Sequence, residues 1–116
     1  MLKTGAHLPL SSDFPGETLD PFAGMYAAVT RQDAAGKPDG GWYPHQRLTR
    51  QEALRGYTIE AAYAGFEEND KGVIEPGKLA DFTVVTTDVL QAPAKDLLST
   101  RVLYTIVGGQ IAYQAK

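Results

Sequence analysis

One aspartate stands where a catalytic carboxylate could be positioned. Asp13 directly follows residues 6–12, in which the apolar Ala6, Leu8 and Leu10 stand at alternate positions. This alternation predicts a β-strand, although Pro9 cannot donate to a strand ladder, which favours an edge or distorted strand. Catalytic groups of α/β barrels lie at the carboxyl ends of strands. Asp13 also precedes Pro15, so its residue type is equally suited to capping a turn, which is the commoner role.

Other candidate metal ligands are few and scattered. The two histidines, His7 and His45, lie far apart and lack the carboxylate spacing of a metal motif. The acidic run of residues 67–70 is typical of a solvated helix exit. No cysteine is present, which excludes disulfides and thiolate metal sites. These residues by themselves predict no metal centre.

Helices are predicted in the first part of the chain. Asp20-Pro21 combines a favourable N-cap with a proline at the first helical position, and helical spacing of apolar residues extends this helix over residues 21–32. A capping box that begins at Thr49 predicts a helix over residues 50–57. A further helix is expected directly after Thr58, with its apolar stripe ending at Phe66.

Loops and turns separate these helices from the rest of the chain. Residues 33–48 contain several glycines and prolines, which predict a loop without regular structure. Trp42 and Tyr43 favour an ordered loop, because large aromatic rings can pack. Further on, Pro76-Gly77 suits the two central positions of a type II turn.

Strands are predicted in the last part of the chain. Residues 82–86 are rich in β-branched side chains, as are parts of residues 101–107. A third strand is expected over residues 110–113, joined by Gly108-Gly109, which tolerates the positive φ of a tight hairpin. A short helix within residues 88–100 completes the prediction.

The composition is that of one ordinary soluble domain. The 116 residues are 43% hydrophobic and 22% charged, with a formal net charge of −3. Interspersed acids and bases provide no electrostatic footprint for nucleic acid or an anionic membrane. No apolar run approaches the roughly 20 residues that span a bilayer. We therefore expect a cytoplasmic protein with neither a nucleic-acid nor a membrane partner.

A succession of motifs runs through nearly the whole chain from about residue 2. They are SDFP (12–15), LDPFAGMYAAVTRQ (19–32), GGWYPHQRLTRQEALRGYTIEAAYAGFEE (40–68), KGVIEPGKLADFTVV (71–85) and VLYTIVGGQIAY (102–113). Together they resemble the C-terminal region of metal-dependent hydrolases of the amidohydrolase superfamily, most closely the branch called amidohydrolase family 3. The PGKLADF run alone is typical of the superfamily as a whole, whereas the long run at residues 40–68 is typical of a much narrower group within it.

The resemblance implies an α+β piece of a (β/α)8-barrel enzyme. Residues 1–70 would be the mostly helical end of the barrel, and residues 71–116 the C-terminal half of a composite β-sandwich. Residues 6–12 would match the eighth barrel strand. Asp13 would match the aspartate at its end that binds the metal or its hydroxide and shuttles the proton. Family members commonly have Gly-Ser-Asp here, whereas this chain has Ser11-Ser12-Asp13.

The implied chemistry needs a divalent metal, zinc being the first choice, which lowers the pKa of a bound water. A catalytic zinc needs about three protein ligands. The family provides a His-x-His pair and further histidines that this sequence lacks. Asp13 would therefore bind metal only in a complete barrel, and we expect the chain alone to hold no cofactor and to be inactive.

Three interpretations stay open at the level of sequence. The chain is a C-terminal fragment of an enzyme that hydrolyses C–N bonds in amides or cyclic amides, or a subunit that contributes Asp13 to an N-terminal barrel subunit, or a non-catalytic binding or structural module. Unpaired strands and apolar faces predict self-association. The first ~14 residues are expected to depart from their barrel role, because a single parallel-type strand buries little.

Overall fold

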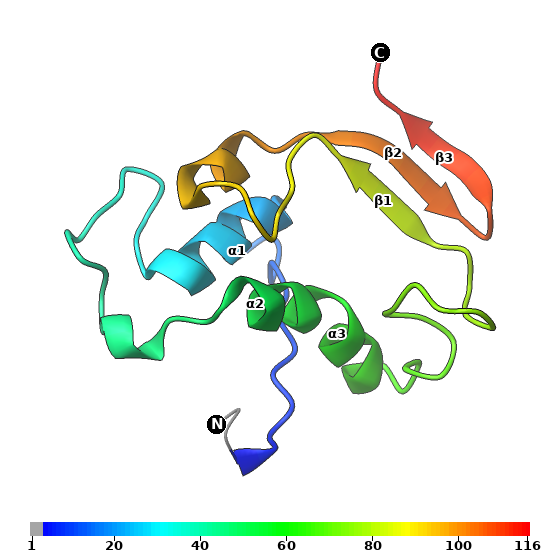
Figure 1. Cartoon of the computed structure of the whole chain (residues 1–116), viewed down its shortest axis with the longest axis horizontal. Coiled ribbons are helices and arrows are strands. Elements are labelled where there is room, and N and C mark those ends of the chain that lie inside the picture. Colours follow the sequence, from blue (N-terminus) through cyan, green and yellow to red (C-terminus); the bar gives the residue numbers. More distant parts are fainter. Residues whose placement is uncertain (1–3) are drawn as a thin grey trace.

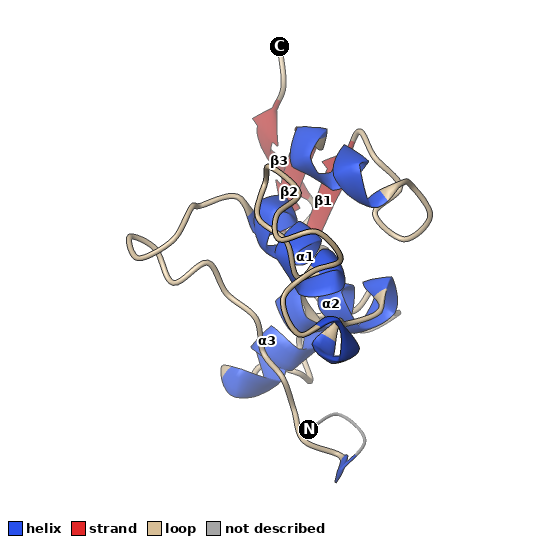
Figure 2. Cartoon of the chain, turned by 90° about the vertical axis from the view of Figure 1, so that its left-hand side faces the viewer, coloured by secondary structure: helices blue, strands red, loops and turns tan. Residues whose placement is uncertain are grey.

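Helices and a small sheet form two neighbouring groups in this computed structural model, which describes residues 4–116 (Figure 1). Its elements are α1 (Pro21–Thr30), η2 (Pro44–Gln46), α2 (Arg50–Tyr57), α3 (Ile59–Ala64), β1 (Phe82–Val85), η3 (Ala94–Ser99), β2 (Val102–Val107) and β3 (Gln110–Gln114), where η marks a 3-10 helix. Figure 2 shows the strands at one end of the molecule and α3 towards the other. The predicted α+β class is confirmed.

Side-chain caps begin the first two helices where the sequence predicts them. The Asp20 carboxylate accepts a hydrogen bond from the Phe22 N–H at 2.9 Å. At α2, Thr49 accepts from the Glu52 N–H, and the Glu52 carboxylate accepts from the Thr49 N–H at 2.7 Å. Hydrogen bonds from the Thr49 backbone and hydroxyl lower the pKa of Glu52. The capping box is thus complete in both directions.

A bend at Thr58 separates α2 from α3. Its backbone leaves helical geometry (φ −123°, ψ −95°), and its hydroxyl donates to the Leu54 carbonyl at 2.8 Å. The predicted break is confirmed, but α3 ends at Ala64, so the predicted extension of the helical stripe to Phe66 is wrong. Phe66 has φ 59° and is 92% exposed. The helix ends before the apolar spacing does, so its last member points to solvent.

The sheet is antiparallel, with strand order β1-β2-β3. Its register pairs Val84 with Tyr104 and Thr105 with Tyr113, and each pair of strands contains one irregularity. The predicted Gly108-Gly109 hairpin is confirmed, with both glycines at positive φ. The Pro76-Gly77 turn is confirmed as well, since the Lys78 N–H donates to Glu75 O and Gly77 has φ 92°.

The core lies between α1, α2 and η3. Its buried side chains are Met25, Tyr26, Ala53 and Leu97. The Arg50 guanidinium adds a polar clamp, donating to the carbonyls of Val89 and Ala92 at 3.0 and 2.8 Å. This arrangement joins the two predicted halves of the chain, because η3 belongs to the part that also contains the sheet.

The long loop between α1 and α2 is ordered by backbone contacts, as its aromatic residues suggest. The Trp42 N–H donates to Arg31 O at 2.8 Å, and the Arg31 guanidinium carbon lies 5.2 Å from the centre of the Trp42 ring. The Arg47 side chain donates to the carbonyls of Gly40 and Thr30. Trp42 itself remains 61% exposed.

The predicted strand over residues 6–12 is wrong. The segment has no strand pairing and makes one backbone hydrogen bond to a helix, from the Leu10 N–H to Gly56 O at 2.9 Å. A parallel strand needs neighbouring strands to accept its hydrogen bonds, and alternation in sequence cannot supply them. The expected departure from a barrel role and the division into barrel and sandwich halves both stay predictions.

Among the helices of residues 4–116, none is both long enough and apolar enough to cross a bilayer.

Candidate functional site

Asp13 lies on an exposed turn beyond the segment docked on the helices. It adopts φ 47°, and its backbone carbonyl accepts from the Gly16 N–H at 2.8 Å. Its own N–H donates to Ser11 Oγ at 3.3 Å. The hydrogen bonds that the structure describes here run through the Asp13 backbone and leave its carboxylate facing solvent. Such a carboxylate can accept a proton or contact a cation brought to it.

A second polar cluster, which the sequence patterns do not predict, ties the N-terminal segment to α2 and α3. Glu60 is only 9% exposed. Its Oε2 lies 2.7 Å from His7 Nδ1, and its Oε1 accepts from Arg55 Nη2 at 2.8 Å. The His7 ring stacks on Tyr63, with 3.6 Å between ring centres and 12° between planes. These hydrogen bonds, the one from His7 foremost, lower the pKa of the Glu60 carboxyl.

The two histidines do not come together. His7 is half exposed and hydrogen-bonded to Glu60. His45 lies in η2, where its ring meets Tyr43 edge-on at 5.9 Å. A signal for the Glu60 cluster was present in the sequence as Arg55 and Glu60 on either side of the predicted helix break. Its third member, His7, lies 53 positions from Glu60 in the sequence, and no local pattern around His7 indicates the contact.

A metal site is not formed by these residues alone. Within the described residues, no group of three or more His, Asp or Glu side chains could hold a metal ion. A single exposed carboxylate does not provide the roughly three ligands that a catalytic zinc requires. The donor set therefore does not fit a resident metal unless ligands come from outside this chain.

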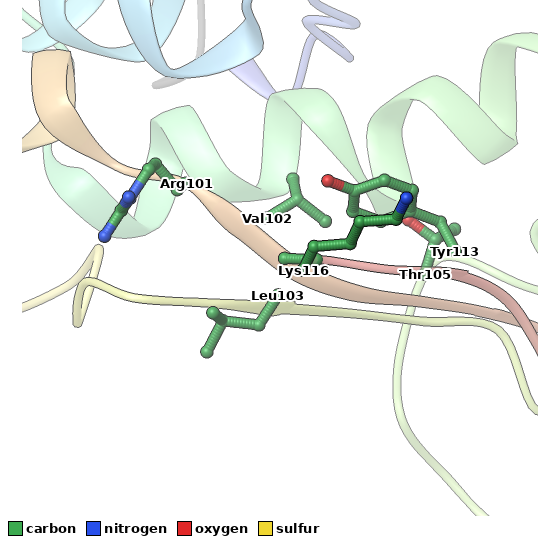
Figure 3. Close-up of a pocket in the computed structure, with 7 residues that line it drawn as sticks. Arg101, Val102, Leu103, Thr105, Tyr113 and Lys116 are labelled. Atoms are coloured by element: carbon green, nitrogen blue, oxygen red, sulfur yellow. The ribbon is translucent and has the colours of Figure 1, made fainter.

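Two surface hollows lie away from Asp13. One, of about 700 Å³, lies against β2 and β3, and Figure 3 shows Arg101 at one end of it and Thr105 and Tyr113 at the other. The other, of about 890 Å³, is a broad and mostly apolar groove between the helices, the turn around Ile74 and the edge of β1. Neither hollow includes Asp13 or the Glu60 carboxylate among its lining residues.

The chain belongs to the amidohydrolase family. The model described as "Amidohydrolase family" matches residues 1–113. In the relatives described next, this chain matches only a small part of each protein's length. This is consistent with a C-terminal region, as the sequence motifs predict.

Three curated relatives and one solved structure define that likeness. The chain is 37% identical over 114 residues to an N-substituted formamide deformylase of Arthrobacter pascens, 38% identical over 113 residues to Protein LONG AFTER FAR-RED 3 of Arabidopsis thaliana, and 31% identical over 103 residues to the putative amidohydrolase YtcJ of Bacillus subtilis. These matches cover 98%, 97% and 89% of this chain but only 19–20% of the relatives.

The solved structure supports the fold. An amidohydrolase from Thermotoga maritima superposes with a TM-score of 0.68 at 20% identity, over 98% of this chain and 24% of that one. The chain thus spans about a fifth of the length of the curated relatives it matches.

Proposed function

We propose that this chain acts as the C-terminal section of a metal-dependent amidohydrolase that hydrolyses C–N bonds in amides or cyclic amides. The observation that carries the proposal is the family match over residues 1–113, which spans nearly the whole chain and includes Asp13. In this proposal residues 1–70 belong to the end of a (β/α)8 barrel and residues 71–116 to a β-sandwich. The proposed enzyme works in the cytoplasm, and a chain without cysteines is compatible with that reducing compartment.

Asp13 is the catalytic residue of the proposal. Its exposed carboxylate is suited to take a proton from the water that attacks the amide carbonyl and to return that proton to the leaving nitrogen. Proton transfer by a positioned side chain contributes roughly 10²–10⁴-fold to a rate. Because the donor set of this chain does not form a metal site, the proposal assigns its residues no step at the metal. A divalent ion such as zinc would need ligands from outside this chain, to which a complete barrel would add Asp13.

The name of one relative suggests where to look for a substrate. The Arthrobacter pascens protein is named for the deformylation of N-substituted formamides. We therefore propose N-substituted amides as the substrate class of the enzyme to which this chain belongs. Formamides are the first substrates to test.

A complementation experiment tests the proposal. The chain is mixed or co-expressed with a polypeptide that carries the N-terminal four-fifths of an amidohydrolase relative, and hydrolysis of N-substituted formamides is followed with zinc present. We expect activity only in the mixture. Asp13→Asn should lower kcat by roughly 10²-fold or more. Asp39→Asn, at an exposed aspartate in the long loop, is the matched control and should leave the rate unchanged.

The outcomes separate the interpretations. Recovery by a separately encoded partner supports a split hydrolase that uses Asp13. Activity that is recovered but insensitive to Asp13→Asn contradicts the assigned role. A mixture that binds but stays inactive favours a non-catalytic module, for which the apolar groove beside β1 offers an independent ligand site.

A further inference from the structure

We propose that Glu60 is a positioning residue, which holds the segment of residues 7–10 on the bend between α2 and α3 through His7 and thereby sets where Asp13 lies. The proposal rests on the proposed function, because it concerns the aspartate assigned there to proton transfer. Its structural part, the docking of the segment, stands on contacts within this chain alone.

The first anchor is the paired carboxylate. Glu60 is almost fully buried, and each of its oxygens has one charged or potentially charged partner, His7 on one and Arg55 on the other. A buried carboxylate that loses its partner is strongly destabilising, whereas an exposed ion pair contributes little. The His7 and Arg55 side chains are 48% and 60% exposed, whereas the carboxylate that they share is buried.

The His7 ring is held on a second side by an aromatic surface. It lies parallel to the Tyr63 ring, one helical turn beyond Glu60, at a centre-to-centre distance of 3.6 Å. One residue of α3 thus fixes the Nδ1 edge of the ring and another supports its face. His7 thus contacts the Glu60 carboxylate and the Tyr63 ring, and Arg55 binds the same carboxylate.

The second anchor is a close backbone contact three residues later. The Leu10 N–H donates to Gly56 O at 2.9 Å. A Cβ placed on Gly56 would lie 2.6 Å from Leu10 Cγ and 3.2 Å from Leu8 O. The glycine therefore allows the segment to lie directly on the helix backbone. Only Ser11 and Ser12 separate this anchor from Asp13, so the position of the carboxylate depends on the docked segment.

Amide hydrogen exchange of the full chain tests the docking. We expect Glu60→Gln, which keeps the shape and removes the charge, to speed exchange of the Leu10 N–H by roughly tenfold or more. Exchange of the Ala53 N–H in α2 reports on global stability and should change less. Glu75→Gln, at an exposed glutamate, is the matched control. Unchanged protection of Leu10 in Glu60→Gln overturns the proposal.

Two variants of His7 keep the test decisive if Glu60→Gln unfolds the chain. His7→Asn places an amide N–H near the position of Nδ1 and should retain most of the Leu10 protection, whereas His7→Leu should lose it. Equal exchange in both variants would show that the hydrogen bond does not hold the segment, which overturns the proposal.

The catalytic consequence is measured in the complemented enzyme. Glu60→Gln should lower kcat with little change in KM, and adding it to Asp13→Asn should cause no further loss, since both act through one carboxylate. Full additivity of the two variants overturns the positioning role. If Asp13→Asn has no effect while Leu10 protection still depends on Glu60, the proposed function fails and the docking stands.

Discussion

At the scale of the residue, the Glu60 carboxylate is buried and hydrogen-bonded through both of its oxygens. It is buried where α3 begins, and hydrogen bonds from His7 and Arg55 favour its charged form over the desolvation that opposes it. Its pKa is therefore lower in the folded chain than in the unfolded chain. Linkage then makes its contribution to stability depend on pH.

The expected direction follows from the sign of that shift. A carboxyl with a lowered pKa contributes stability above its unfolded pKa, and this contribution is lost as the pH falls through the folded pKa. We expect the free energy of unfolding of Glu60→Gln to fall less between about pH 7 and pH 3 than that of the wild type. Urea titrations at the two pH values measure this difference. Glu75→Gln should behave as the wild type, and an identical pH dependence in Glu60→Gln would contradict the assignment.

At the scale of the element, the packing of α2 depends on how closely other segments can approach its backbone. One face of α2 carries Ala53 into the core, and its last turn lies under Leu10 at Gly56. A similar close contact occurs at Gly24 of α1, where the Tyr57 side chain occupies the space that a Cβ would need. Glycine within a helix costs about 1 kcal/mol relative to alanine. At these two positions the missing side chain is what lets another element lie close.

Gly56→Ala measures the balance between helix propensity and close packing against Leu10. Alanine should gain about 1 kcal/mol of helix propensity, while overpacking against Leu10 costs about 1–3 kcal/mol. We expect a net loss of about 1 kcal/mol in the free energy of unfolding, measured by urea denaturation. In a Leu10→Ala background the same substitution should become neutral or stabilising. Gln51→Ala, on the exposed face of α2, should change stability by less than about 0.5 kcal/mol.

At the scale of the whole molecule, the sheet is the least covered part. Within residues 4–116, no further strand pairs with the outer strands β1 and β3, and every residue of β3 is exposed. Exposed apolar side chains on β2 and β3 include Leu103, Val107, Ile111 and Tyr113. An open edge with apolar neighbours is a template for pairing with another strand. In the proposed complete enzyme this part would be covered by the rest of the protein.

The isolated chain should cover this region by self-association with a second copy. We expect sedimentation velocity to show species above the 12.5 kDa monomer at micromolar concentration. Ile111→Lys combined with Tyr113→Lys should shift the distribution to the monomer. Trp42→Lys, at an exposed aromatic residue of the long loop, is the control and should not. A monodisperse wild-type monomer contradicts the prediction.

The sequence by itself determined the features that depend on neighbouring residues. Asp20-Pro21 and the Thr49 capping box begin helices, and Pro76-Gly77 and Gly108-Gly109 make turns, because each satisfies backbone groups or φ values within a few positions. The motifs also identified the amidohydrolase family, which the match over residues 1–113 confirms. Asp13 was also identified as a candidate from neighbouring residues alone, because the prediction used only its residue type and its place after an alternating segment.

Only the tertiary structure decided what depends on distant partners. Residues 6–12 alternate as a strand would, yet with no neighbouring strand they dock on Gly56 instead. Phe66 continues an apolar stripe that the helix does not follow to its end. His7 meets Glu60 across 53 positions of sequence. Pairing, helix length and long-range contacts are settled by the surface available after folding, and no local pattern encodes that surface.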